Sequence, residues 1–409
     1  MKLLFLSDNF PPEVNAPATR TFEHCREWAE SDIEVTVITC FPNFPEGKLF
    51  AGYKNRLCQK EDIEGIRVIR VFTYITANHG FYKRTVDYIS FGLSAFLAGL
   101  FIRTDLIVAT SPQFFAAISG RWLSFFKRKP WIMEVRDLWP ESIKTVGAMT
   151  DNFVIRYFER LELRLYRSAC QIITVTDSFK KNIIKKGISP AKISVIKNGA
   201  NLALYTPRPK NQQILTELGL NGKFIVGFIG TLGMAHKLDF IIEAASKIND
   251  TGIHFLFIGA GAEKKHLELL IEAIKPGNVT LLGMIQKDRV PDYLSAIDVS
   301  LINLRKAETF KTVIPSKIFE SAAMEKPILL GVDGESRQLV ENYPAGLYFE
   351  PENESDFIEK LYLLKNDKAL YESLKLGCQN LVKDFDRVKL AKDMADILYT
   401  IGDNHKGQL

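Results

Sequence analysis

The stretch FIVGFIGTLGMAHKLDFIIEAA (residues 224–245) holds three kinds of local sequence in a row. An apolar run predicts a buried β-strand, the turn Gly230-Thr231-Leu232-Gly233 follows it, and a segment with helical spacing of apolar residues comes last. Glycines in such a turn let the backbone approach a diphosphate, and Lys237 or His236 can add positive charge. A single turn of this kind is common, so its meaning depends on the rest of the chain.

Short apolar runs alternate with helical patterns along the whole sequence. Nearly continuous runs of this length predict parallel strands that are buried on both faces. The polar segment NLALYTPRPKNQQ separates two series of runs: KLLFLS, EVTVIT, IRVIRVF, DLIVATS, WIMEV, QIITVT and ISVIK, then FIVGFIG, IHFLFIG, NVTLLG, DVSLINL and PILLG. We therefore expect two doubly wound α/β domains, at residues 1–200 and 201–385, with a linker near residues 198–210 and a last helix in DRVKLAKDMADILYT.

The totals agree with two domains. A chain of 409 residues with 46% hydrophobic side chains is too long for one ordinary core. Its five cysteines are scattered and form no C-x-x-C motif, so neither a disulfide framework nor a zinc site is indicated, and a reducing compartment is expected. The start MKLLFLSDNFPPE has one lysine and a short apolar run, which does not predict an export signal.

Positive charge is concentrated in the first half of the chain. Residues 1–200 hold 28 Lys and Arg against 20 Asp and Glu, whereas the remainder holds 25 against 28. Such an excess favours anionic lipid, nucleic acid or a phosphorylated substrate, although a solvated basic face is its commoner cause.

The longest apolar stretch, YISFGLSAFLAGLFI (88–102), is shorter than the roughly 18 residues of a membrane-spanning helix. Two interpretations stay open: a helix that packs inside the first domain, or one that lies in a membrane surface. The second is favoured by flanking basic and internal aromatic residues, namely Lys83, Arg84, Arg103, Phe91, Phe96 and Phe101, and by the basic run at 127–129.

A second loop of the phosphate-binding kind lies in TVIPSKIFESAAMEKPILLG (312–331). Pro315 and Ser316 predict a helix start, whose free N–H groups and positive dipole favour phosphate. Lys317 adds charge, and Glu320, one turn later, can accept hydrogen bonds from a ribose diol. The alternative is a helix cap with a Lys317–Glu320 surface pair. Two such loops in one domain suit a nucleoside diphosphate bound between them.

In the first domain, SDNFPPEVNAPATRTFEHC and WIMEVRDLWPES follow predicted strands. Ligands of doubly wound sheets bind beyond the carboxyl ends of the strands, so Arg136, Asp137 and Glu141 are candidates. A carboxylate such as Asp137 can act as a base or orient an acceptor hydroxyl. The alternative is that Asp137 caps a turn or pairs with Arg136.

These motifs carry a family resemblance over nearly the whole chain. PPE in the first loop, Asn198-Gly199, the GTLG turn and Glu320 in a helix before a Lys-Pro strand entry resemble the GT-B glycosyltransferases of family 4. SDNFPPEVNAPATRT, RDLWPESIKTVGAM and FKTVIPSKIFE are similar to the bacterial N-acetyl-L-fucosamine transferases of O-antigen and capsule assembly.

The resemblance implies a fold, a substrate and a location. It implies two Rossmann-like domains that face a central cleft, with a last helix (386–405) that packs back on the first domain. A UDP-sugar donor would be held by the second domain, and a glycan or undecaprenyl-diphosphate-linked acceptor by the first. The protein would then be cytoplasmic and peripheral on the inner face of the cytoplasmic membrane.

The resemblance also implies residue roles, with departures. It assigns Glu320 to the ribose, and it places Lys311, Thr312 and Lys317 near the donor phosphate or sugar. The family's first glutamate falls at Thr312, and its usual arginine after the turn glycine falls at Thr231. Asn15-Ala16 stands where many members have two glycines, and Asn201 stands in place of a common aspartate.

No cofactor is expected, because the UDP-sugar is a substrate. No metal is expected either. The one D-x-D motif, Asp384-Phe385-Asp386, sits in a helical C-terminal pattern, and the six histidines are isolated. We expect a retaining-type glycosyltransferase for an amino-deoxy sugar and no nucleic-acid partner. The alternatives are a UDP-sugar 2-epimerase of similar architecture and a non-catalytic two-domain binding protein.

Overall fold

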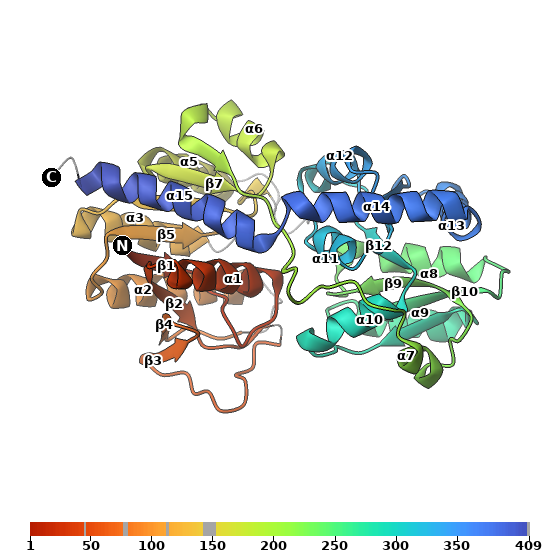
Figure 1. Cartoon of the computed structure of the whole chain (residues 1–409). Helices are drawn as coiled ribbons and strands as arrows, with labels where there is room; N and C mark the ends of the chain where they lie inside the picture. Colours follow the sequence, from red (N-terminus) through yellow and green to blue (C-terminus); the bar gives the residue numbers. More distant parts are fainter. Residues whose placement is uncertain (45, 77–80, 112–113, 142–152, 407–409) are drawn as a thin grey trace. The chain divides into compact units, whose positions relative to one another are not determined.

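The computed structural model describes residues 1–44, 46–76, 81–111, 114–141 and 153–406. The chain divides into two compact α/β units: unit 1 comprises residues 1–197 and 387–409, and unit 2 comprises residues 198–386 (Figure 1). The boundaries expected from the sequence lie within three residues of this division. Both units are Rossmann-like, with helices on the faces of a largely parallel sheet.

Unit 1 is built on an eight-stranded sheet in the order β3-β4-β2-β1-β5-β6-β7-β8. All neighbouring strands are parallel except β3 and β4. Its elements are β1 (Lys2–Leu6), α1 (Ala16–Glu30), β2 (Glu34–Cys40), β3 (Cys58–Ile63), β4 (Ile66–Val71), α2 (Phe81–Leu100), β5 (Leu106–Thr110), α3 (Phe114–Lys127), β6 (Trp131–Val135), α5 (Phe153–Ser168), β7 (Gln171–Thr174), α6 (Asp177–Lys185), the 3-10 turn η1 (Pro190–Lys192), β8 (Ile193–Val195) and α15 (Arg387–Lys406).

The seven strands expected in this half are all present, and β3 is an eighth. β5 and β6 are buried along their whole length, as expected for strands covered on both faces. β3 (CQKEDI) alternates exposed and half-buried residues and pairs with β4 as an antiparallel edge. Its sequence has no apolar run, because an edge strand of this kind buries little of either face.

The last helix, α15, belongs to unit 1, as expected from the sequence. Its residues Leu390, Met394 and Leu398 are buried in the same core cluster as Trp28 of α1. The Trp28 indole Nε1 donates a hydrogen bond of 2.8 Å to the carbonyl of Ala391. A helix from the far end of the chain therefore completes the core of the N-terminal sheet.

Unit 2 is built on a six-stranded parallel sheet in the order β11-β10-β9-β12-β13-β14. Its elements are α7 (Gln212–Glu217), β9 (Phe224–Ile229), η2 (Met234–His236), α8 (Leu238–Ser246), β10 (Ile253–Ile258), α9 (Lys264–Ile274), β11 (Val279–Leu282), η3 (Lys287–Arg289), α10 (Val290–Ala296), β12 (Val299–Asn303), η4 (Glu308–Thr312), α11 (Lys317–Ala323), β13 (Ile328–Gly331), α12 (Glu335–Asn342), β14 (Gly346–Tyr348), α13 (Glu354–Asn366) and α14 (Lys368–Asp384).

The segment expected to be a linker is partly core. Ala200 and Tyr205 are buried in the main cluster of unit 2. The amide of Ala200 donates to the carbonyl of Phe385 at 3.1 Å, and Ala200 also forms a parallel bridge with Asp386. The expectation of a linker at 198–210 was therefore wrong for its first half, because small and aromatic side chains there pack against the unit.

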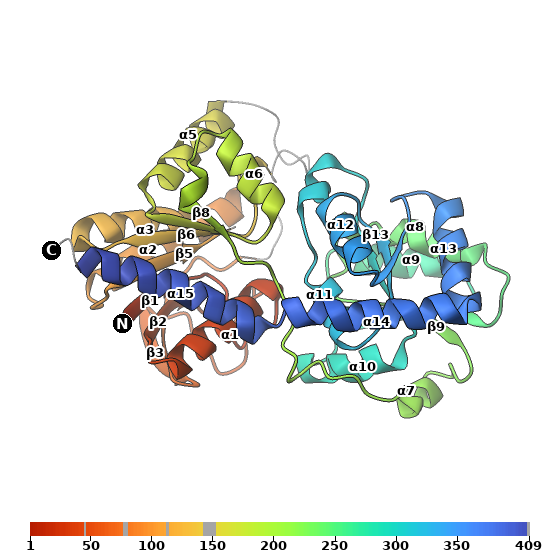
Figure 2. The ribbon, with the colours of Figure 1, turned by 45° about the horizontal axis from the view of Figure 1, so that its top comes forward.

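Strand order reverses once in each sheet. In unit 1 the reversal lies between β1 and β5, which are labelled in Figure 2, and in unit 2 it lies between β9 and β12. Loops at the carboxyl ends of the strands beside such a reversal form the usual ligand crevice of doubly wound sheets. The donor-side candidates follow β9 and β12 and Asn15 follows β1, whereas Arg136, Asp137 and Glu141 follow β6, one strand beyond β5.

The docking of α15 can be tested by fluorescence. We expect Leu398→Ala to lower the free energy of unfolding of unit 1 by about 2–5 kcal/mol, because it empties a fully buried position. All four tryptophans (28, 122, 131 and 139) lie in unit 1, so urea unfolding followed by tryptophan fluorescence reports on that unit. Lys392→Ala, exposed on the same helix, is the control. Equal midpoints for the two variants would contradict the expected role of α15.

Candidate functional site

The loops after β9 and β10 meet backbone to backbone in unit 2. The amide of Gly230 donates to the carbonyl of Ile258, and that of Leu232 to the carbonyl of Ala260, both at 2.9 Å. A Cβ on Gly259 would lie 1.8 Å from the Gly230 carbonyl oxygen, and one on Gly261 would lie 2.2 Å from that of Leu232. No residue with a side chain fits at either glycine. Sequence reasoning missed this pair, although IGAGA after the strand IHFLFI was the signal.

Lys317, the first residue of α11, folds back against the β9 loop. A Cβ on Gly230 would lie 2.4 Å from Lys317 Cε, so the glycine leaves room for the lysine stem. Its Nζ lies 3.7 Å from the centroid of the Phe228 ring, a cation–π contact. Among the described residues, this buried Nζ has no hydrogen-bond partner. Burial lowers the pKa of Lys317 to about 7, and the charge of Glu320 opposes the shift.

His236 joins the β9 loop to the end of β12. Its Nδ1 lies 3.1 Å from the carbonyl of Asn303, whose side-chain amide donates to the His236 carbonyl at 2.9 Å. Burial, followed by the charge of Lys317, lowers the pKa of His236 to about 3. The imidazole is therefore neutral at physiological pH. The expectation that His236 could add positive charge was wrong, because its ring is buried beside another cation.

The start of α11 differs from the expected cap. Ser316 already has helical angles (φ −59°, ψ −25°), and its side chain caps nothing. Glu320 lies one helical turn after Ser316, as expected, because its amide donates to the carbonyl of Ser316 at 3.3 Å. The alternative of an exposed Lys317–Glu320 surface pair was wrong, since Lys317 Nζ is buried.

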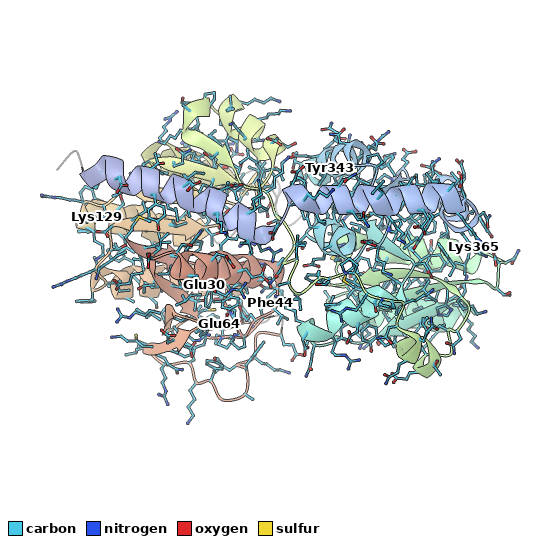
Figure 3. All side chains as sticks on the ribbon, viewed as in Figure 1. Glu30, Phe44, Glu64, Lys129, Tyr343 and Lys365 are labelled. Carbon is cyan, nitrogen blue, oxygen red and sulfur yellow. The ribbon has the colours of Figure 1, made fainter. Side chains whose placement is uncertain are left out.

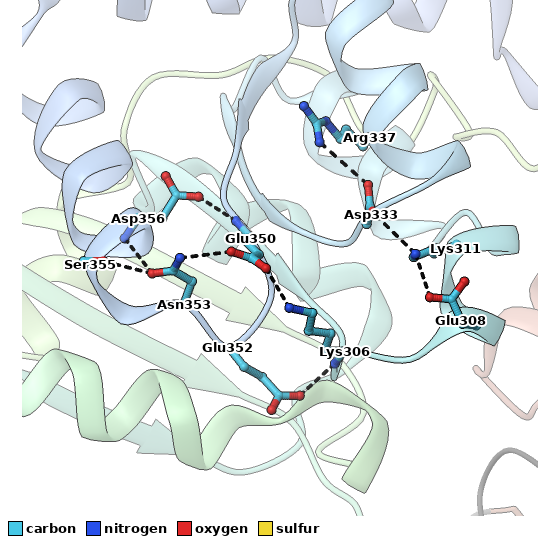
Figure 4. A network of polar contacts seen from close by, with 10 residues as sticks. All are labelled: Lys306, Glu308, Lys311, Asp333, Arg337, Glu350, Glu352, Asn353, Ser355 and Asp356. Carbon is cyan, nitrogen blue, oxygen red and sulfur yellow. Dashed lines mark hydrogen bonds and ion pairs between the residues drawn. The ribbon is translucent and has the colours of Figure 1, made fainter.

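Lys311 and Thr312 lie in η4, where each has a partner of its own. Lys311 Nζ lies 2.7 Å from Glu308 and 3.8 Å from Asp333 (Figure 4). The hydrogen bond to Glu308 raises the pKa of Lys311. The Thr312 hydroxyl donates to the carbonyl of Thr309 at 2.8 Å. Lys311 is thus a charge-balanced cation on an exposed turn.

The remaining donor-side candidates line the β9 turn. Thr231 is exposed, and Gly233 precedes η2. Lys237 has a left-handed backbone (φ 47°), and its Nζ pairs with Asp239 at 2.7 Å. That hydrogen bond raises the pKa of Lys237. The structure therefore brings Gly230, His236 and Lys317 together, and Lys237 lies on the same turn with its charge already paired.

In unit 1, Asn15 and Arg136 meet at the first turn of α1. Asn15 caps the helix: its side-chain oxygen accepts from the amide of Ala18 at 2.8 Å. Arg136, after β6, donates to the carbonyls of Ala16 and Pro17 at 3.2 and 3.1 Å. Burial lowers the pKa of Arg136 to about 10. Both candidates hold this helix start in place.

Glu141 is not brought to that group. Its carboxylate pairs with Lys186 at 2.9 Å, and Lys186 also pairs with Glu162 at 2.9 Å, so Lys186 at the end of α6 links Glu141 to Glu162 of α5. Asp137 follows Arg136. Burial and the charge of Glu162 are the larger causes that raise the pKa of Tyr166, and the charge of Asp137 raises it further. Residues 142–149 of RDLWPESIKTVGAM lie outside the described residues.

A group of three carboxylates in unit 1 was missed by sequence reasoning. Glu13 accepts hydrogen bonds from the amides of Asn43 and Phe44 at 2.8 and 2.9 Å, and its Oε2 is buried without a partner among the described residues. Burial raises the pKa of Glu13 and of Asp87 to about 7, and the charge of Asp8 adds to both shifts. The signal was present in SDNFPPE, where Asp8 and Glu13 flank two prolines after β1.

Family models and relatives agree on one class of enzyme. Residues 15–199 match the glycosyl transferase 4-like domain, and residues 223–367 match the glycosyl transferases group 1 domain. WcaI of Escherichia coli K12, whose name assigns it to colanic acid biosynthesis as a glycosyl transferase, is 23% identical over 404 residues, 94% of this chain and 98% of its own length. A UDP-Gal:alpha-D-GlcNAc-diphosphoundecaprenol alpha-1,3-galactosyltransferase of E. coli is 24% identical, covering 59% of this chain and 62% of its own length.

Solved structures agree on the fold. The crystal structure of Anabaena HepE in complex with UDP and glucose covers 98% of this chain and 100% of its own, with a TM-score of 0.73 at 18% identity. Together with the matched domains, this likeness defines a glycosyltransferase of GT-B fold. The chain is a GT-B glycosyltransferase that carries the glycosyl transferase 4-like and group 1 domains, with relatives in bacterial surface polysaccharide synthesis.

The buried amine of Lys317 predicts a pH-dependent cost to stability. Its pKa of about 7 in the folded state lies below the unfolded value of about 10.4, so between these values the unfolded state binds more protons and stability rises with pH. We expect Lys317→Met to stabilise unit 2 at pH 7 by on the order of 2–4 kcal/mol, with a gain that shrinks toward pH 10.

Hydrogen exchange followed by mass spectrometry on β9 and α11 peptides measures this gain. Lys265→Met, exposed on α9, is the control. A gain for Lys317→Met that is equal at pH 7 and pH 10 would assign the effect to packing and contradict the charge argument.

Proposed function

We propose that this glycosyltransferase moves an amino-deoxy sugar, N-acetyl-L-fucosamine or a close relative, from a UDP donor to a glycan or an undecaprenyl-diphosphate-linked acceptor. The product would enter a bacterial surface polysaccharide such as O-antigen or capsule. The name of WcaI supports a polysaccharide pathway, and that of the diphosphoundecaprenol galactosyltransferase supports a lipid-linked acceptor. The HepE structure, solved with UDP, supports UDP as the donor nucleotide.

The observation that carries the proposal is the buried ammonium group of Lys317. It lies beside Gly230, and it has no hydrogen-bond partner among the described residues. A buried cation without a partner is costly, and a donor diphosphate would supply the missing negative charge. Glu320, one turn farther along α11, would accept the ribose hydroxyls.

The chemistry we propose is mainly electrostatic. The backbone N–H groups of Thr231 and Gly233 in the β9 turn, with Lys317 and Lys237, would stabilise charge on the departing diphosphate. Lys311 and Thr312 would contact the donor phosphate or sugar from η4. Asp137 would orient the acceptor hydroxyl on the side of unit 1. We further propose that this chain needs no metal ion for transfer and does not bind nucleic acid.

The D-x-D motif gives no support to a metal site. Asp384 ends α14 and accepts a hydrogen bond from the Tyr343 hydroxyl, and Asp386 bridges to Ala200. The motif is thus a break between two helices, where continuous helix was expected. The described residues contain no group of three or more His, Cys, Asp or Glu side chains placed to hold a metal ion.

The epimerase alternative is not favoured. Both matched domains are described as glycosyl transferases, and the relatives named above are transferases over the matched length. A binding protein without turnover is disfavoured for the same reason. Release of UDP that depends on an acceptor separates transfer from either alternative.

We propose that the enzyme works in the cytoplasm as a peripheral protein on the inner face of the cytoplasmic membrane, where a lipid-linked acceptor would be reached. None of the helices within the described ranges is long and apolar enough to cross a membrane. Contact with lipid would therefore have to come from a surface, and anionic lipid suits the basic first half of the chain.

The ribose contact can be tested with UDP alone. We expect Glu320→Gln to weaken UDP binding by about 1.5–3 kcal/mol, the contribution of a hydrogen bond to a charged group. Titration calorimetry measures the affinity, and Glu272→Gln, exposed on α9, is the matched control. Unchanged affinity in a folded Glu320→Gln variant would leave Glu320 with a structural role.

Donor identity needs a panel. We expect UDP-N-acetyl-L-fucosamine or a related 6-deoxy amino sugar to be transferred to a lipid-linked N-acetylglucosamine acceptor in preference to other donors. Mass spectrometry of the product with each UDP-sugar measures the preference. A strong preference for UDP-glucose would overturn the proposed sugar and leave the transferase class in place.

A further inference from the structure

The outer face of α2 carries an exposed apolar stripe. Val86, Ile89, Leu93 and Leu97 recur at the spacing of one helix face, and each is close to half exposed or more. Phe101, just beyond the helix, is 88% exposed. A surface helix of a monomer normally turns its apolar stripe inward, so a second stripe outward indicates a contact with something else.

Helix α3 extends this stripe with aromatic rings. Trp122, Phe125 and Phe126 are 50%, 71% and 58% exposed and stack on one another with ring centroids 5.5–6.3 Å apart. Phe126 also stacks on Phe96 of α2 at 5.7 Å. The two helices lie side by side in Figures 1 and 2. We call this surface, residues 86, 89, 93, 97, 101, 122, 125 and 126, the α2–α3 face.

The close contact of the two helices makes the face continuous. The hydroxyl of Ser119 donates to the carbonyl of Gly92 at 2.6 Å. A Cβ on Gly92 would lie 2.9 Å from Phe115 Cβ, and one on Gly99 would lie 2.6 Å from Leu123 Cδ1. Small residues on the inner side of α2 let the helix backbones approach, so the outer side chains of both helices share one surface.

This face corrects the expectation from sequence. Phe91, expected among the surface aromatics, is fully buried, and Phe96 is only partly exposed, whereas Phe101 is exposed as expected. The contribution of α3 was missed. Its sequence FFAAISGRWLSFFK is apolar on two sides of the helix, so composition alone does not show which side faces the core.

The charges around the face are mainly positive. Residues 83–129 contain seven basic residues (83, 84, 103, 121, 127, 128 and 129) and two acidic residues, Asp87 and Asp105. The Asp105 carboxylate accepts the amide of Lys2. Lys127 Nζ donates to the carbonyls of Leu100 and Ile102 at 2.9 and 2.7 Å, so it caps α2. Arg128 is exposed, and Lys129 is labelled on unit 1 in Figure 3.

We propose that the α2–α3 face docks on an anionic membrane surface, with its aromatic rings at the boundary between headgroups and acyl chains and its basic residues on the headgroups. The inference deepens the proposed peripheral location and rests on it. An apolar face bordered mainly by basic residues complements anionic lipid. A second copy of the chain is a poorer partner, because a two-fold contact would bring two positively charged rims together.

The test is flotation of the full chain with vesicles. We expect recovery with phosphatidylglycerol–phosphatidylcholine vesicles at low salt, less in high salt, and little with phosphatidylcholine alone. Trp122→Gln with Phe125→Gln should lower partition about tenfold or more at every salt concentration. Arg128→Gln with Lys129→Gln should remove the salt-dependent part of the recovery with vesicles. This variant keeps Lys127, the cap of α2.

Matched controls separate this result from a general change in the protein. Leu269→Gln with Leu376→Gln removes two apolar side chains in unit 2, each 57% exposed, and should float like the wild type. The inference is overturned if the wild type stays at the bottom of the gradient at low salt. It is equally overturned if Trp122→Gln with Phe125→Gln floats unchanged, or if sedimentation shows a dimer that this variant abolishes.

A second readout distinguishes this inference from the proposed transfer. With a water-soluble acceptor analogue, the wild type and Trp122→Gln with Phe125→Gln should transfer sugar at equal rates. Equal transfer without flotation of the wild type would remove the docking surface and retain the transferase function. If the wild type floats but does not transfer sugar, the docking proposal stands and the proposed donor or acceptor is wrong.

Discussion

The backbone contact between the loops after β9 and β10 fixes the donor side of this enzyme. Gly259 and Gly261 let the second loop touch the carbonyls of the first, and Gly230 leaves the space into which Lys317 folds. The contact holds the turn in place from the side of the β10 loop. It fixes the position of the N–H groups of Thr231 and Gly233, and donors at a fixed position are what stabilisation of a departing diphosphate requires.

Two buried cations, one in each unit, are held differently. In unit 1, Arg20 is buried but satisfied: it pairs with Glu134 at 3.0 Å and donates to the carbonyls of Ile196 and Lys197. In unit 2, the buried Lys317 amine contacts the face of the Phe228 ring and has no hydrogen-bond partner among the described residues. Paired burial is typical of a scaffold, because each charge is compensated within the fold. A buried cation without a compensating charge, at a strand-end loop, is typical of a site that binds an anion.

Sequence periodicity was sufficient for the architecture and for part of the site. Continuous apolar runs gave the parallel strands, whereas β3 and β14 escaped because one alternates polar residues at an edge and the other has three residues. Lys317 was singled out because it follows a Pro-Ser helix start in the same domain as a second turn of the phosphate-binding kind. Gly259 and Gly261 were missed, because their meaning lies in a contact with another loop. The charge of His236 was misjudged and the ion pair of Glu141 was not foreseen for a related reason: their partners, Asn303 and Lys186, are distant in sequence.

The place of α15 has a consequence for the order in which the nascent chain folds. The core of the N-terminal sheet closes only when Leu390, Met394 and Leu398 pack against Trp28, and these residues are translated after the whole of unit 2. Unit 2, which ends at residue 386, can complete its own core earlier. Until α15 has been translated, Trp28 of α1 lacks these apolar contacts, so unit 1, which is begun first, completes its core later than unit 2 can.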